Sequence, residues 1–200
     1  MMGKLAALLA AMALLTGCGG MKIEDFSNGG PTLTLEEYFD GRARAWGVFE
    51  DRFGNLRRQF TVDIEGDWDP ETRTLTLVED FDYRDGETER RVWTLTKTGS
   101  DSYEGTADGV VGTARGKIAG NAFNWTYTFD MAVGDSTWRV DFDDWMFLQP
   151  GGVIVNRAAV SKWGIQIGRA MIMFQKLDEA RVGTLGASPP IGAGARVAAE

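Results

Sequence analysis

The stretch FNWTYTFDM, residues 123–131, alternates large apolar side chains with polar ones. Successive side chains of an extended chain point to opposite faces, so this period of two predicts a β-strand with one apolar and one polar face. The stretch FTVDIEGDW, residues 60–68, repeats the pattern. Such strands need a shared core for their apolar faces, and the sequence therefore predicts an all-β domain.

Turn signals separate the alternating runs, among them Gly54-Asn55, Asp85-Gly86, Gly120-Asn121 and Gly134-Asp135. They predict nine or ten antiparallel strands, many of about 10 residues, joined consecutively by short loops. Long strands in consecutive order favour a closed up-and-down β-barrel of the lipocalin-like (calycin-like) kind over a sandwich.

A short N-terminal helix is expected before the sheet. Thr34 and Glu37 have the spacing of a capping box, and Leu33 with Tyr38 has the spacing of a hydrophobic staple. Gly41 then suits the end of the helix. Such a helix could plug one end of a barrel.

The N-terminus has the pattern of a bacterial lipoprotein signal peptide. An apolar run, residues 5–15, follows Lys4 and ends in Leu15-Thr16-Gly17-Cys18, which holds the sole cysteine. We expect residues 1–17 to be removed and Cys18 to be lipidated. The run is too short for a transmembrane helix, which needs about 20 apolar residues. A plain secretory signal remains the alternative.

These features predict a cellular location and an order of domains along the chain. Gly19, where Asp would favour the inner membrane, favours anchoring by N-terminal acyl chains at the periplasmic face of the outer membrane. The expected parts are a signal peptide (1–17), a flexible tether (18–31), a barrel (32–176) and a disordered C-terminal tail (177–200).

The amino-acid composition argues against several classes of function. The net charge of −8 argues against nucleic-acid binding, which requires a basic face. Histidine is absent, and lipidation of Cys18 would consume the only thiol, so we expect no metal site, no cofactor and no enzyme activity. The acidic runs 80–85 and 141–144 do not match a calcium loop.

Four glycines punctuate residues 105–116: Gly105, Gly109, Gly112 and Gly116. A phosphate-binding loop is one interpretation, but the Walker spacing is absent. Glycines within strands more often mark bulges, bends or close approach of other groups, which is the interpretation we favour.

Charged residues on apolar faces predict a binding site inside the barrel. Alternation places Glu79, Arg91 and Asp144 among inward-facing apolar residues, where buried charges need partners or water. The predicted ligand-binding residues are Glu79, Arg91, Trp93, Trp125, Tyr127, Phe142 and Asp144. A structural ion pair, a bulge that turns these charges outward, and simple core packing of the tryptophans are the alternatives.

Several spaced motifs accompany the Cys18 tetrad: EDFDYRDGE (79–87), RVW (91–93), WTY (125–127), FDDWM (142–146), NRA (156–158), KWG (162–164) and IMF (172–174). Together they resemble the bacterial lipoprotein family catalogued as domain of unknown function 3833, over roughly residues 30–176. The resemblance implies a class and a location, with no assigned reaction.

Three functions follow as hypotheses. The favoured one is a lipocalin-like module that binds a fatty acid or another apolar molecule in the periplasm. The second is a structural or interaction lipoprotein whose barrel is filled by its own side chains, with a partner that the sequence does not identify. The third is an enzyme that uses carboxylates such as Glu79 and Asp144.

Overall fold

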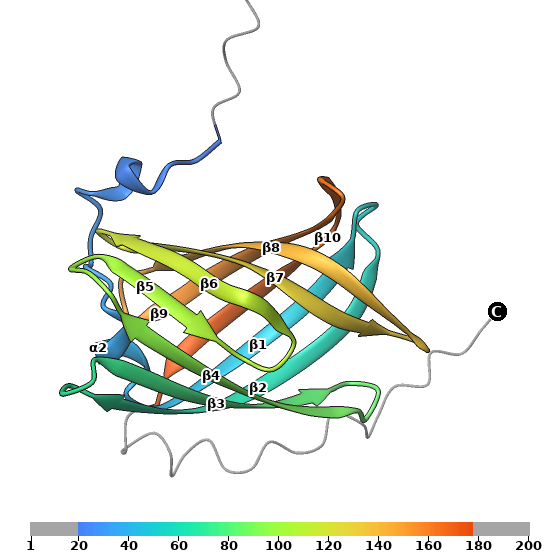
Figure 1. The fold of residues 1–200 in the computed structure, drawn as a ribbon, viewed down its shortest axis with the longest axis horizontal. Helices are drawn as coiled ribbons and strands as arrows, with labels where there is room; N and C mark the ends of the chain where they lie inside the picture. Colours follow the sequence, from blue (N-terminus) through green and yellow to red (C-terminus); the bar gives the residue numbers. More distant parts are fainter. Residues whose placement is uncertain (1–19, 178–200) are drawn as a thin grey trace, which may run out of the picture.

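Ten antiparallel strands close into one barrel in the computed structural model, which describes residues 20–177 (Figure 1). Each strand pairs with the next one along the chain, and the last pairs with the first. The predicted all-β up-and-down barrel is therefore confirmed. The strands are β1 (Gly41–Asp51), β2 (Leu56–Asp69), β3 (Thr74–Tyr83), β4 (Thr88–Lys97), β5 (Ser102–Thr106), β6 (Val110–Ala119), β7 (Ala122–Val133), β8 (Ser136–Leu148), β9 (Val153–Lys162) and β10 (Ile165–Lys176).

The alternating pattern determines which side chains face the barrel interior. On β7, Phe123 and Trp125 are buried, whereas Thr126 is exposed. On β2, Ile64 is buried and its neighbour Glu65 is exposed. Because the pleat sends alternate residues to opposite faces, the apolar residues of each strand mostly face the interior and the polar residues mostly face the outside.

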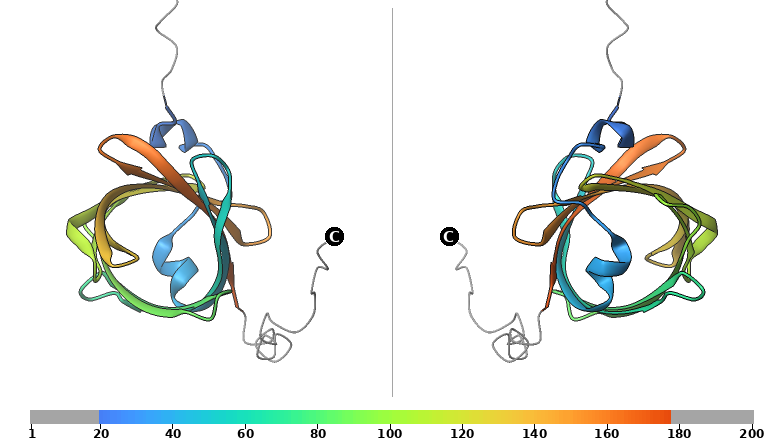
Figure 2. Two further views of the ribbon diagram at one scale, coloured as in Figure 1. Left: turned by 90° about the vertical axis from the view of Figure 1, so that its right-hand side faces the viewer. Right: turned by 90° about the vertical axis from the view of Figure 1, so that its left-hand side faces the viewer.

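A short helix, α2 (Leu35–Phe39), lies inside one end of the barrel (Figure 2). The Tyr38 hydroxyl donates hydrogen bonds to the carbonyl oxygens of Gly152 and Phe174, at 3.0 and 2.9 Å, and so ties the helix to the wall. The helix plugs this end through its buried side chains, Leu35, Tyr38 and Phe39. The predicted plug helix is present.

The capping box predicted for α2 does not form. Thr34 is the N-cap residue, but its side chain makes no cap hydrogen bond. Contacts from the wall hold the helix instead: Glu36 accepts a hydrogen bond from the Tyr103 hydroxyl at 2.7 Å and forms an ion pair with Lys97. Tertiary contacts therefore replace the local cap that the sequence spacing indicated.

The described part of the expected tether packs on the outer wall of the barrel. Residues 23–26 form a 3-10 helix, η2 (Ile23–Phe26), and the Phe26 ring lies 5.8 Å from the Trp145 ring and 5.3 Å from the Phe147 ring. Trp145 faces away from the interior, yet it is only 5% exposed. The segment therefore contacts the barrel wall through Phe26, and its role as a tether stays a prediction.

Glycines inside the strands make room for rings, as the structural interpretation predicted. A Cβ at Gly105 would lie 3.0 Å from the Trp125 ring, and one at Gly116 would lie 2.5 Å from the Phe123 ring and also overlap Trp125. Gly112 has a φ of +76° and lies where the pairing of β6 with β7 shifts register. These positions serve packing and bending of the sheet.

We expect Gly116→Ala to lower the free energy of unfolding by about 2 kcal/mol, because the new methyl group overpacks two buried rings. The measurement is chemical denaturation. Gly99→Ala is the matched control, since its Cβ would have no neighbour closer than 3.4 Å. Equal stability of the two variants would contradict this account of Gly116.

Several predictions fall on residues outside the described range. They concern the signal peptide (1–17), lipidation of Cys18 and the tail from residue 178 onward. Within residues 20–177, no helix is long and apolar enough to cross a membrane.

Candidate functional site

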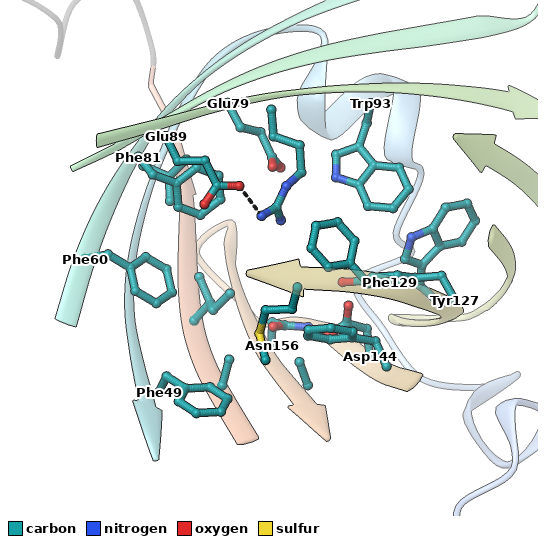
Figure 3. A pocket seen from close by; sticks show the side chains of 18 of the residues that line it. Phe49, Phe60, Glu79, Phe81, Glu89, Trp93, Tyr127, Phe129, Asp144 and Asn156 are labelled. Atoms are coloured by element: carbon teal, nitrogen blue, oxygen red, sulfur yellow. Dashed lines mark hydrogen bonds and ion pairs between the residues drawn. The ribbon is translucent and has the colours of Figure 1, made fainter. Parts of the chain in front are cut away.

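The barrel encloses a cavity of about 1010 Å³. The plug helix α2 closes one end of it through Leu35 and Phe39. Residues from the hairpin ends β1–β2, β3–β4 and β7–β8 line the opposite end, among them Arg58, Glu87 and Val133. The wall between the two ends is mostly aromatic and aliphatic, and Figure 3 shows Glu79, Glu89, Asp144 and Asn156 among its polar groups.

The register of β3 against β4 places the predicted charges inside. Glu79 and Arg91 are direct cross-strand partners, and pairing runs without a shift from Thr74 to Asp82. The alternative of a bulge that turns these side chains outward is therefore wrong. Both residues line the cavity, and the surface of Glu79 that remains accessible faces this interior (Figure 3).

Arg91 is bound to a partner that the sequence analysis did not select. Its Nη2 donates a hydrogen bond to Glu89 at 2.5 Å, and Glu89 also accepts one from the Tyr83 hydroxyl at 2.9 Å. Glu89 lies two positions before Arg91, so the period of two already places both on one face. This two-residue spacing is the sequence feature that could have predicted Glu89 as a partner of Arg91.

The Arg91 guanidinium is also enclosed by rings. It lies 5.1 Å from the centre of the Phe81 ring and 5.0 Å from that of Phe129, distances suited to cation–π attraction. Its Nε is buried and has no hydrogen-bond partner. A buried donor without a hydrogen-bond partner costs free energy, so burial of this nitrogen destabilises the folded protein.

Asp144 forms a second polar position across the cavity. It is 7% exposed, and it accepts a hydrogen bond from the amide of Asn156 at 3.4 Å and one from the Tyr127 hydroxyl. The Tyr127 ring stacks on Phe142 with ring centres 4.8 Å apart. Asn156, which is 1% exposed, was also missed by the sequence analysis, because its partner lies on a different strand.

The surroundings change the acidity of both carboxyl groups. Burial raises the pKa of Glu79 to about 7; Arg91 opposes this rise, while Glu89 and Asp144 add to it. Burial likewise raises the pKa of Asp144 to about 6, against the hydrogen bonds from Asn156 and Tyr127. Near neutral pH, each group therefore lies close to the balance between its neutral and its charged form.

Trp93 and Trp125 both pack the core and line the cavity. Their rings lie 5.8 Å apart, edge to face, and they are only 7% and 4% exposed. The alternative interpretation, that the tryptophans pack the core, is therefore also correct: both residues pack in the core and line the cavity. The structure brings all seven predicted side chains to the wall of one cavity: Glu79, Arg91, Trp93, Trp125, Tyr127, Phe142 and Asp144. Their part in ligand binding stays a prediction.

The sequence model of a family described as protein of unknown function (DUF3833) matches residues 12–176. The chain belongs to this family. The DUF3833 match ends at Lys176, where the resemblance was expected to end, but it starts well before residue 30. It therefore includes Cys18 and part of the apolar run. Among curated proteins, none is similar enough to be matched to this DUF3833 member.

Five chains of solved structures match this DUF3833 protein. One is the structure of the S-type phycobiliprotein lyase CPES from Guillardia theta, with a TM-score of 0.55 and 10% sequence identity. The alignment covers 80% of the DUF3833 chain and 99% of the lyase chain. At this identity the likeness shows the fold alone, and that fold is lipocalin-like, as predicted.

The name of this neighbour bears on the expectation that the protein is not an enzyme. CPES is named a lyase, but a likeness at 10% identity carries no reaction over to this DUF3833 chain, so the expectation stays a prediction. Within residues 20–177, no group of three or more Asp, Glu or Cys side chains is arranged to hold a metal ion.

Proposed function

We propose that the barrel binds a lipid or another apolar molecule, with the apolar body against the aromatic wall and the polar end near Glu79, Arg91 and Asp144. The observation that carries this proposal is the cavity of about 1010 Å³. Its size is at the upper end of the range of about 300–1,000 Å³ for small-molecule sites, and its apolar wall with a few convergent polar groups is characteristic of them. A barrel filled by its own side chains, the structural alternative, would leave no such space.

The test uses the full chain with Cys18→Ser, which prevents acylation. Native mass spectrometry of the purified protein is expected to show a copurified small molecule. After its removal, titration with a fluorescent long-chain probe is expected to saturate at one equivalent. Absence of both copurified ligand and saturable binding would refute the proposal.

The fluorescence of a tryptophan in the cavity wall reports directly on binding inside the barrel. Because Trp93 lines the cavity, its fluorescence is expected to change when a ligand enters, and Trp93→Phe should remove a large part of that change. Trp163→Phe is the matched control, because Trp163 is 88% exposed on the turn between β9 and β10. If both variants lose the signal equally, the probe does not bind in the cavity.

We further propose that acyl chains on Cys18 hold the protein at the periplasmic face of the outer membrane. Supporting this are the tetrad at Cys18, the glycine after it and the family match, which includes both positions. Several acyl chains together make detachment negligible, because each buried methylene contributes about 0.8 kcal/mol.

Cell fractionation tests the anchor. The unaltered protein is expected in the outer-membrane fraction, and Cys18→Ser is expected in the soluble periplasmic fraction, because it cannot be acylated. Ser27→Ala serves as a control, since Ser27 is exposed and lies outside the tetrad. Retention of Cys18→Ser in the membrane fraction would rule out the acyl anchor.

A further inference from the structure

The polar groups inside the cavity are mostly acidic. Five carboxyl side chains line the cavity and its mouth, Glu79, Glu87, Glu89, Asp130 and Asp144, against three guanidinium groups, those of Arg57, Arg58 and Arg91. In an enclosed, weakly screened space, the charge of an entering group matters more than it does in water. The balance of charge therefore opposes a ligand with an anionic end.

Neighbouring carboxylates already balance the charge of Arg91, because Glu89 forms an ion pair with it and Glu79 also acts on it electrostatically. The Nη2 of Arg91 is already bound to Glu89, and its guanidinium lies between the rings of Phe81 and Phe129. The Nε that has no partner is buried from the cavity as well as from solvent, so a ligand in the cavity does not reach it. An incoming carboxylate that approached Arg91 would meet the negative charges of Glu79 and Glu89 beside this one guanidinium.

The guanidinium groups at the mouth of the cavity are also occupied. Arg57 pairs with Asp51 at 2.6 Å. Arg58 pairs with both Asp85 and Glu87, at 3.0 and 2.8 Å. Within residues 20–177, every guanidinium that lines the cavity thus already has a carboxylate partner, and no lysine lines it.

By contrast, one carboxylate inside the cavity has no hydrogen-bond donor. The carboxylate of Glu79 accepts no hydrogen bond from any described residue, and it faces the cavity. Aromatic rings surround this space, including Phe81, Tyr127 and Phe142, and the face of a ring attracts cations. A carboxylate that accepts no hydrogen bond, in a space with aromatic walls, is suited to an ammonium group.

From this arrangement we infer that the cavity selects an amphiphile with a cationic end, of the long-chain amine class, over a fatty-acid carboxylate. The inference rests on the proposed function and specifies its ligand class. The ammonium group pairs with Glu79, and the alkyl chain lies along the aromatic wall. No bond forms or breaks.

Binding of such a ligand depends on pH in a definite direction. Glu79 must be ionised to pair with an ammonium group, and burial raises its pKa to about 7. The groups that face it are Arg91 and Glu89 on β4, Asp144 on β8 and Tyr127 on β7. The affinity for the amine is therefore expected to rise between about pH 5 and about pH 8, whereas the affinity for the carboxylate falls.

The test compares three probes with the same chain: dodecylamine, dodecanol and laurate. Each displaces a fluorescent long-chain probe from the Cys18→Ser protein, below its aggregation concentration. At about pH 8 we expect dodecylamine to bind about tenfold more tightly than laurate, with dodecanol between them. Glu79→Gln is expected to remove most of this preference and to leave the affinity for dodecanol unchanged.

Asp80→Asn is the matched control. Asp80 is the next residue on the same strand and pairs with Arg90 on the outer face, so its removal should leave the preference intact. If Asp80→Asn reduces the preference as much as Glu79→Gln does, the amine binds to the acidic surface and the inference fails. Laurate binding as tightly as dodecylamine overturns the inference but leaves the proposed function standing. Displacement by none of the three probes overturns the proposed function itself.

Discussion

The free energy of unfolding is expected to fall by about 3 kcal/mol when the pH rises from about 5 to about 8, because Glu79 must ionise inside the barrel. Its pKa rises from the ordinary 4.5 to about 7 in the folded protein, chiefly through burial. Asp144, whose pKa rises from 3.8 to about 6, acts in the same direction. Denaturant unfolding at several pH values measures the change.

The sign follows from proton binding. Between the unfolded and folded pKa values, the folded protein holds a proton that the unfolded chain releases, so the folded state is favoured on the acidic side. The contribution of Glu79 is complete below about pH 4.5 and is lost as the pH passes about 7. The carboxyl groups with lowered pKa values act oppositely, but they titrate below this window. They are Glu36, Asp51, Asp69, Asp80 and Asp130.

Glu79→Gln is the decisive variant, because the amide resembles the protonated acid and does not ionise. We expect this variant to lose most of the pH dependence and to be more stable than the unaltered protein at about pH 8. Asp80→Asn, on the outer face of the same strand, should keep the pH dependence. A stability that stays constant or rises from about pH 5 to about pH 8 in the unaltered protein would show that Glu79 is not held in the enclosed site described here.

Ala158→Trp is expected to weaken binding of a long-chain probe at least about tenfold, because the indole would occupy space that the ligand needs. Ala158 lines the cavity and is the cross-strand partner of Asp144, so the added ring enters beside the polar cluster. Displacement titration with the fluorescent probe measures the effect. Circular dichroism and thermal unfolding establish that the barrel remains folded.

Ala159→Trp is the matched control for this variant. It makes the same substitution one position along β9, where the side chain points to the outer face. Ile172→Trp gives a second block of the cavity from β10, in case the first variant does not fold. If folded Ala158→Trp and Ile172→Trp both bind the probe normally, the ligand does not occupy the barrel.

Some features of the site follow directly from the sequence. The period of two on β3 and β4 is enough to place Glu79 and Arg91 on inward faces, since each strand alternates without interruption. Similarly, the glycines of residues 105–116 could be assigned to packing and bending, because they fall within alternating runs and lack phosphate-loop spacing. The rings that they accommodate, Phe123 and Trp125, come from the next strand and required the register.

Other features depend on contacts between distant segments. Thr34 and Glu37 have capping-box spacing, yet α2 is held by Tyr38 and Glu36 through partners far along the chain. The expected tether packs on the barrel because Phe26 covers Trp145, a ring on the outer face. Local spacing cannot reveal either contact, since the partners are brought together only when the barrel closes.

The alternation, the turns and the set of residues that face inward follow from the sequence, because they depend on neighbours along one chain. The tertiary structure alone decided that the interior holds a cavity, since the space left between ten strands depends on how their side chains meet. Tertiary contacts also determine that Arg91 donates a hydrogen bond to Glu89, whereas Glu79 accepts none and interacts with Arg91 only as a nearby charge. Closing the barrel determines which charges lie near one another, because Glu79, Arg91 and Asp144 come from three different strands.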